Sequence, residues 1–163
     1  MTFPMKIDLE KLVTSVFQDV FMTSFRMNMR MDGPGAYLLN GEAHIAGAVG
    51  FIGDMTGVAY IYLPVSLARR LTSIVVGIDE ADVDADEMIN DSVGEIANMI
   101  VGGFKGKLSQ SNILCVLTIP SIVRGSNFVV EPVSDTERFV CSFRTETNQQ
   151  VVVEVLIKPS KPE

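Results

Sequence analysis

The sequence predicts an α+β fold in which helices pack on a mostly antiparallel β-sheet. Two long segments repeat apolar residues at the 3.6-residue period of an amphipathic helix, over residues 7–24 and about 84–108. Several shorter segments are rich in β-branched residues and are separated by glycine and proline. With 163 residues, 47% of them hydrophobic, the chain is long enough to bury one core, so we expect a single domain over residues 1–163.

The first half is predicted to alternate between helix and strand. After the helix over 7–24, residues 25–31 alternate apolar and polar side chains, which is typical of a half-buried strand, and Asp32–Gly35 forms the predicted turn after it. Residues 42–52 and 57–63 read as an antiparallel pair. A short helix then covers 66–76.

The second half is predicted to begin with the long helix. The acidic run over residues 79–87 suits the start of that helix, through the macrodipole and through capping by aspartate. Four strands are expected after it, over residues 113–120, 121–130, 138–145 and 151–158. The order of helix then strands, repeated once, suggests a loose internal duplication of an αβ unit.

One face of the long helix carries the candidate site. At about 100° per residue, Asp91, Glu95, Asn98 and Gly102 fall on one side, opposite a stripe of apolar residues. Asparagine and glycine are poor helix formers, and small residues beside Glu95 and Asn98 would let another surface approach closely. A solvated face of a surface helix remains the alternative on pattern alone.

Composition excludes several classes of function. A net charge of −7 argues against a nucleic-acid partner, which needs clustered lysine and arginine. No apolar run reaches 18 residues and the first residues lack a signal core, so we expect a soluble, cytoplasmic protein with no membrane partner. Cys115 and Cys141 lack the spacing of a zinc or redox site, and the lone histidine, His44, is expected to be structural.

A longer pattern resembles a known family. Asp91-x-x-x-Glu95-x-x-Asn98, followed by Met-Ile-x-Gly and, about twenty residues later, by Pro120, is similar to the signature of the CheC/CheX/FliY chemotaxis phosphatases, and most similar to the CheX branch. The glycine-punctuated segment 47–64 and the helix after it resemble the preceding part of that family. The resemblance covers roughly residues 5–157, so the CheX-like core is expected over those residues.

The resemblance implies a substrate, and the residue chemistry suits it. An amide cannot act as a general base, but it accepts and donates hydrogen bonds at once, and hydrolysis of a phosphoryl group requires mainly the positioning of a water molecule. The family implies an aspartyl phosphate on a CheY-type response-regulator receiver domain, whose own site carries Mg²⁺ and a lysine. Glu95 would then dock on that lysine and Asn98 would orient the water. The chain would need no cofactor of its own.

Only one copy of the motif is found. The first helix has Glu10 followed by Val13, where a second Glu-x-x-Asn needs an asparagine. A single motif resembles CheX, which implies a homodimer. A non-catalytic receiver-binding or flagellar-switch-like module that uses the same helix is the competing hypothesis. A metal-dependent hydrolase built on Asp91 and Glu95 is disfavoured, because no histidine or third carboxylate is expected to face them.

Overall fold

The structure is a computed structural model that describes residues 7–34 and 42–158. The described helices are α1 (Leu9–Phe25), α2 (Val65–Val76) and α3 (Asp86–Gln110), with a short 3-10 helix at Glu80–Asp82. The described strands are β1 (Arg30–Pro34), β2 (His44–Gly53), β3 (Thr56–Pro64), β4 (Cys115–Leu117), β5 (Ser121–Gly125), β6 (Glu137–Arg144) and β7 (Gln150–Lys158). This confirms the α+β prediction.

All strands join one antiparallel sheet in the order β1-β6-β7-β3-β2-β4, and β5 also pairs with β2. The predicted hairpin is β2 and β3, paired from His44↔Pro64 to Phe51↔Gly57. On its other side β2 pairs with β4 at one end and with β5 at the other. The short strands β4 and β5 therefore follow one another along the same edge of β2.

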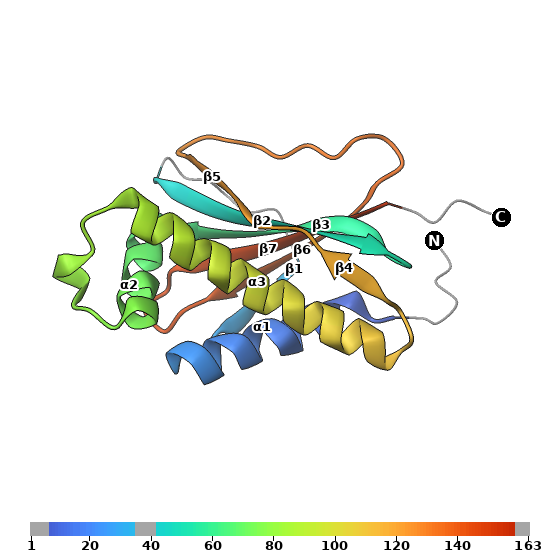
Figure 1. Cartoon of the computed structure of the whole chain (residues 1–163), viewed down its shortest axis with the longest axis horizontal. Helices are drawn as coiled ribbons and strands as arrows, with labels where there is room; N and C mark the ends of the chain where they lie inside the picture. The colour runs from blue at the N-terminus through green and yellow to red at the C-terminus, as the bar shows by residue number, and fades with distance from the viewer. Residues whose placement is uncertain (1–6, 35–41, 159–163) are drawn as a thin grey trace.

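The helices lie together on one side of the sheet, and the connection between β5 and β6 crosses the other side (Figure 1). α3 contacts α1, α2 and β2, so it is the central helix of its layer. Its apolar stripe is buried, with Ile89, Val93, Ile96 and Ile100 each at most 1% exposed. The opposite stripe of α3, which carries Glu95, is therefore left to solvent, as the periodicity predicted.

Local sequence explains where the helices begin and end, with one correction. The Asp8 side chain accepts a hydrogen bond from the Lys11 amide (3.1 Å), which caps α1. Gly77 ends α2 in the left-handed conformation, as predicted. The prediction that an aspartate caps the long helix was wrong, because Ala85 is the N-cap of α3 and makes no side-chain bond there. Asp86 and Glu87 still place negative charge in the first turn.

Two predicted strands were misplaced for identifiable reasons. Residues 25–31 do alternate, with Met27 and Met29 buried, but ladder pairing with β6 begins only at Arg30. Asp32 therefore lies within β1 beside a bulge instead of in a turn, while Gly35 lies outside the described residues. The strand predicted over 121–130 ends at Gly125, because Phe128 and Val130 leave the ladder and pack on the outer face of the sheet.

The remaining strand predictions differ mainly in length. The segment predicted as a strand over 113–120 forms only Cys115–Leu117, whereas β6 and β7 lie within a residue of the predicted bounds. Both cysteines are buried free thiols, as expected. Among residues 7–34 and 42–158, no helix combines the length and apolar character that crossing a bilayer requires.

Candidate functional site: a groove between α3 and β5

The candidate residues lie along two adjacent rows of α3. Asn90, Gly94 and Asn98 are spaced by four residues and form the row nearer β5, while Asp91 and Glu95 form the next row outward. Glu95 and Asp91 are exposed and Asn98 is half-buried. The structure thus places both predicted site residues, Glu95 and Asn98, on one groove that also includes Asp91.

The second wall of the groove comes from β5 and the residues just before it. Pro120 and Ile122 line it opposite the helix, and the space, including its open side, is about 980 Å³. Gly94 sets the width, since a Cβ at that position would lie 3.3 Å from Cγ of Pro120, tighter than ordinary packing. Small size at Gly94 therefore lets the strand edge approach the helix next to Asn98.

Thr118 fixes the chain at the point where β4 gives way to β5. Its amide donates to the Gly50 carbonyl (2.9 Å), and its hydroxyl accepts from the Gly50 amide (2.9 Å). The next residues, Ile119 and Pro120, make no ladder pair with β2, and proline has no N–H to donate. Pro120 is thereby held against α3 from a short interruption in the edge of the sheet.

An arginine joins the two walls near the start of α3. Arg124 Nε donates to Asn90 Oδ1 (2.7 Å), and its guanidinium also donates to the Asp86 carbonyl (3.2 Å) and lies 3.5 Å from the Asp86 carboxylate. Arginine only donates, so this contact fixes which way the Asn90 amide is turned: its oxygen faces Arg124. Arg124 therefore sets the spacing between α3 and β5 at one end of the groove.

The polar side chains at the centre of the groove are free. Within residues 7–34 and 42–158, no side chain bonds or ion-pairs with Glu95, Asn98 or Asp91. The described part of the chain also holds no group of three or more histidine, cysteine, aspartate or glutamate residues placed to bind a metal. The groove thus offers the Glu95 and Asp91 carboxylates and the Asn98 amide to an outside molecule.

The described histidine, the two cysteines and Glu154 are all buried. His44 is buried, and its Nδ1 lies 2.7 Å from the Glu42 carbonyl oxygen, which supports its predicted structural role. Burial raises the pKa of the thiols of Cys115 and Cys141, so the reactive thiolate form is disfavoured at both. Glu154 is fully buried and bonded at both carboxylate oxygens.

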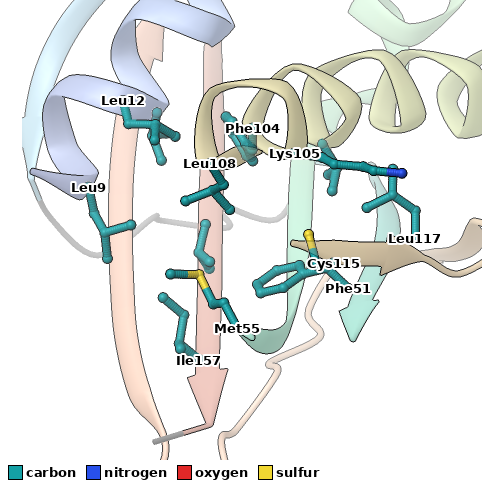
Figure 2. Close-up of a pocket in the computed structure, with 13 residues that line it drawn as sticks. Leu9, Leu12, Phe51, Met55, Phe104, Lys105, Leu108, Cys115, Leu117 and Ile157 are labelled. Carbon is teal, nitrogen blue, oxygen red and sulfur yellow. The ribbon is translucent and has the colours of Figure 1, made fainter. Parts of the chain in front are cut away.

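An apolar hollow lies further along α3, between its last turns, α1 and the hairpin of β2 and β3 (Figure 2). Lys105 is its one charged lining residue, and Figure 2 shows the side-chain nitrogen pointing away from the apolar side chains. The lining offers no hydrogen-bonding surface to orient a substrate. We assign this hollow to core packing.

Sequence reasoning missed two residues that line the groove, Asn90 and Ile122, and the arginine that joins its walls, Arg124. Asn90 had a signal, because it lies four residues before Gly94 and eight before Asn98 on the same row of the helix. Ile122 and Arg124 had none, since their proximity to α3 depends on which edge of β2 the strand joins. That choice is a tertiary feature that local periodicity does not encode.

Comparison with known proteins identifies the family of the chain. A family described as chemotaxis phosphatase CheX matches residues 45–144, which include α3, β5 and both predicted site residues. The chain belongs to the CheX family. Membership confirms the resemblance drawn from the Asp91, Glu95 and Asn98 pattern. No curated protein matches the chain.

Solved structures show the same fold at low sequence identity. A CheX from Desulfovibrio desulfuricans is 20% identical with a TM-score of 0.78, and the match covers 93% of this chain and 100% of that one. A CheC-like superfamily protein from Shewanella sp. PV-4 is 22% identical, with a TM-score of 0.78 and coverage of 95% and 100%. A CheX–CheY–BeF3–Mg²⁺ complex from Borrelia burgdorferi is 19% identical, with a TM-score of 0.77 and coverage of 94% and 100%.

Proposed function

We propose that this chain is a phosphatase that accelerates hydrolysis of the aspartyl phosphate on a CheY-type response-regulator receiver domain. The observation that carries the proposal is the free pair Glu95 and Asn98 on an exposed face of α3, in a chain of the CheX family. The CheX of Borrelia burgdorferi forms a complex with CheY, BeF3 and Mg²⁺, and BeF3 is a stand-in for a phosphoryl group. We place the reaction in the cytoplasm.

Asn98 would promote hydrolysis by orienting the attacking water molecule. Its amide is half-buried at the edge of the groove and bonds to no described residue, so both its donor and its acceptor are available. Entering the phosphorylated site, it would hold a water molecule in line with the phosphorus atom, and the Mg²⁺ and lysine of the receiver would neutralise the developing charge. The magnesium belongs to the receiver, and the chain itself would need no cofactor.

Glu95 would supply docking. It lies three residues before Asn98 on an adjacent part of the helix surface and is exposed, so it reaches outward with the amide. Pairing with the receiver lysine would place Asn98 over the phosphoryl group. Asp91 is exposed one turn earlier and extends the negative charge of this face, which favours approach of a basic rim.

We also propose that the chain forms a homodimer. Exposed large apolar side chains occur on β4, on β5 and in the connections that follow them, including Val116, Ile119 and Val129 at 70%, 88% and 73% exposure. An apolar, incompletely covered sheet edge is a surface that proteins usually pair or shield. Sedimentation equilibrium should give twice the chain mass, and Val129→Lys should lower that mass if this surface forms the interface.

The test of the phosphatase proposal is the decay of a phosphorylated, Mg²⁺-loaded receiver domain, with and without this chain. We expect decay to accelerate with the native chain and to fall by about 100-fold or more with Asn98→Ala, the usual size of the loss when one positioned hydrogen-bonding group is removed. Asn98→Ala should still bind the receiver. Binding without accelerated decay by the native chain would support the non-catalytic, switch-like module instead.

A further inference from the structure

A second polar pocket lies at the far end of the helical layer from the apolar hollow. It is formed where α1 ends, beside α2 and the turn between β6 and β7, and its space is about 460 Å³ including the mouth. Phe25, Met27 and Ile74 give it an apolar surface, and Arg26 and Arg70 give it two positive charges. Sites for small molecules commonly combine an apolar lining with a few convergent polar groups.

The backbone of Arg26 is the first indication that its side chain has a use. Arg26 lies in the left-handed region, with φ of 52°. The other described non-glycine residues with positive φ are Asn112, Asp135 and Asn148, which are of the types that tolerate this region. Glycine is the residue that ends helices in this conformation at least cost, and an arginine occupies the position instead.

Arg70 gives a second, independent indication. It is only partly exposed, and within residues 7–34 and 42–158 its guanidinium has no hydrogen bond or ion pair. The neighbouring Arg69 donates to the Val83 carbonyl, and Arg124, Arg138 and Arg144 each pair with a carboxylate. Within the described part of this acidic chain, whose net charge is −7, the guanidinium groups of Arg26 and Arg70 thus both lack a hydrogen-bond or ion-pair partner at the same pocket.

The remaining polar groups define the charge of the ligand. Thr145 is buried at the pocket. Its hydroxyl accepts a hydrogen bond from the Gln149 backbone amide (3.0 Å), which stabilises the turn between β6 and β7. Glu146 is exposed at the same turn, and its one negative charge repels a bound anion. The two guanidinium groups outnumber it, and guanidinium forks match the oxygens of carboxylates and phosphates.

We propose that this pocket binds a small organic anion, a carboxylate or a phosphate monoester attached to an apolar group. Arg26 and Arg70 hold the anionic oxygens, and the apolar group packs on Phe25, Met27 and Ile74. The pocket shares no lining residue with the groove that holds Glu95 and Asn98, so the proposal does not depend on the phosphatase function.

The test is titration of the full chain with phenyl phosphate and with phenylacetate, followed by amide NMR shifts. 2-Phenylethanol serves as the neutral control. We expect one of the anions to shift the amides of residues 25–27 and 145–147 saturably, and the neutral alcohol to shift them far less. Comparison of the two anions shows which head group is preferred. Equal, non-saturating shifts with all three compounds would overturn the proposal.

Substitutions that are expected to change the Kd of the anion in opposite directions make the test more specific. Arg70→Gln should raise the Kd of the bound anion about tenfold, the usual effect of losing one charge-assisted hydrogen bond. Glu146→Gln should lower the Kd, because the opposing charge is removed. Arg30→Gln makes the same charge change at an exposed residue outside the pocket and should leave the Kd unchanged. An unchanged Kd in Arg70→Gln would contradict the proposal.

Arg26 allows its effect on folding to be separated from its effect on binding. Arg26→Gly removes the side chain and relieves the left-handed backbone, so the variant should fold at least as stably as the native chain and bind the anion more weakly. If the arginine serves only to end α1, the stability of the variant will change while its anion affinity stays native, and the assignment fails. Asn98→Ala should keep native anion affinity, since it alters only the groove.

Discussion

Two glutamates on opposite sides of the sheet show how a site differs from a structural contact. Glu154 on β7 is 0% exposed, and its two oxygens accept from the Tyr62 hydroxyl (2.7 Å) and from Arg138 Nε (2.5 Å). Glu95 on α3 is exposed and bonds to no described residue. The buried carboxylate is committed to the fold, whereas the exposed one is available to a partner.

The surroundings of the two glutamates differ in the same way. Glu154 lies under a small apolar cluster on the outer face of the sheet that includes Tyr62, Val152 and Phe128, so removal of either partner would leave a buried polar group unsatisfied. Glu95 borders a wide groove whose walls are fixed by other residues, Pro120 against Gly94 and Arg124 on Asn90. Substitution there should alter recognition and leave folding intact.

The largest stability effect is expected from Glu154→Ala. It removes the Glu154 carboxylate that accepts hydrogen bonds from the Tyr62 hydroxyl and from Arg138. We expect the free energy of unfolding to fall by about 2–3 kcal/mol, because Arg138 is partly solvated and the full cost of a broken buried pair is not reached. The free energy of unfolding is measured by urea titration of the native chain and the variant. Tyr62→Phe removes one hydrogen bond and should cost about 1 kcal/mol. Unchanged stability in Glu154→Ala would contradict the assignment.

Glu95→Lys is expected to have the opposite profile. Its free energy of unfolding should stay within about 0.5 kcal/mol of the native value, as for most exposed substitutions. Its affinity for the phosphorylated receiver should fall more than about tenfold, because a lysine would face the lysine of the receiver. Binding is measured by titration of a BeF3-loaded, Mg²⁺-bound receiver.

A control of equal charge distinguishes local pairing from general attraction. Glu87→Lys makes the same change about 12 Å away along the helix axis, eight residues earlier in α3. We expect its effect on affinity to be small and to vanish at high salt, where the charges of exposed groups are screened. Equal losses in Glu87→Lys and Glu95→Lys would show that Glu95 acts only through net charge.

Arg124→Gln should have an intermediate effect on both properties. It removes the bonds from β5 to Asn90 and Asp86, so unfolding should become easier by about 1 kcal/mol, and the groove beside Asn98 should lose its fixed width. We expect kcat for receiver dephosphorylation to fall severalfold with little change in affinity. Arg30→Gln, an exposed arginine on β1, is the control and should alter neither. A native kcat in Arg124→Gln would show that Arg124 is not needed to position the groove beside Asn98.

The sequence carried enough information for the helix side of the site. Apolar residues at the helical period place Ile96 and Ile100 in the core, so Glu95 and Asn98 have to lie on or near the exposed side, and the structure places them there. The strand side was not predictable. Residues 121–130 contain β-branched and aromatic residues beyond Gly125, but Phe128 and Val130 pack on the outer face without ladder pairing, so composition alone overestimates the length of the strand. Pairing with β2, which brings Pro120 to Gly94, is a nonlocal choice.

The smallest effect is expected at high pH and concerns Tyr60, beside Glu154. Burial, and then the negative charge of Glu154, raise the pKa of Tyr60 above its usual value. In the unfolded chain a tyrosine ionises near pH 10, so between that pH and the higher pKa of the folded state the unfolded chain has lost a proton that the folded chain retains. The free energy of unfolding should therefore be fully retained below about pH 10 and fall as the pH rises through the folded-state pKa.

Urea unfolding at about pH 8 and about pH 11 measures this decrease in the free energy of unfolding with pH, and Tyr60→Phe should reduce the decrease. An identical slope in Tyr60→Phe would place the alkaline sensitivity elsewhere and leave Glu154 without a measurable influence on its neighbour.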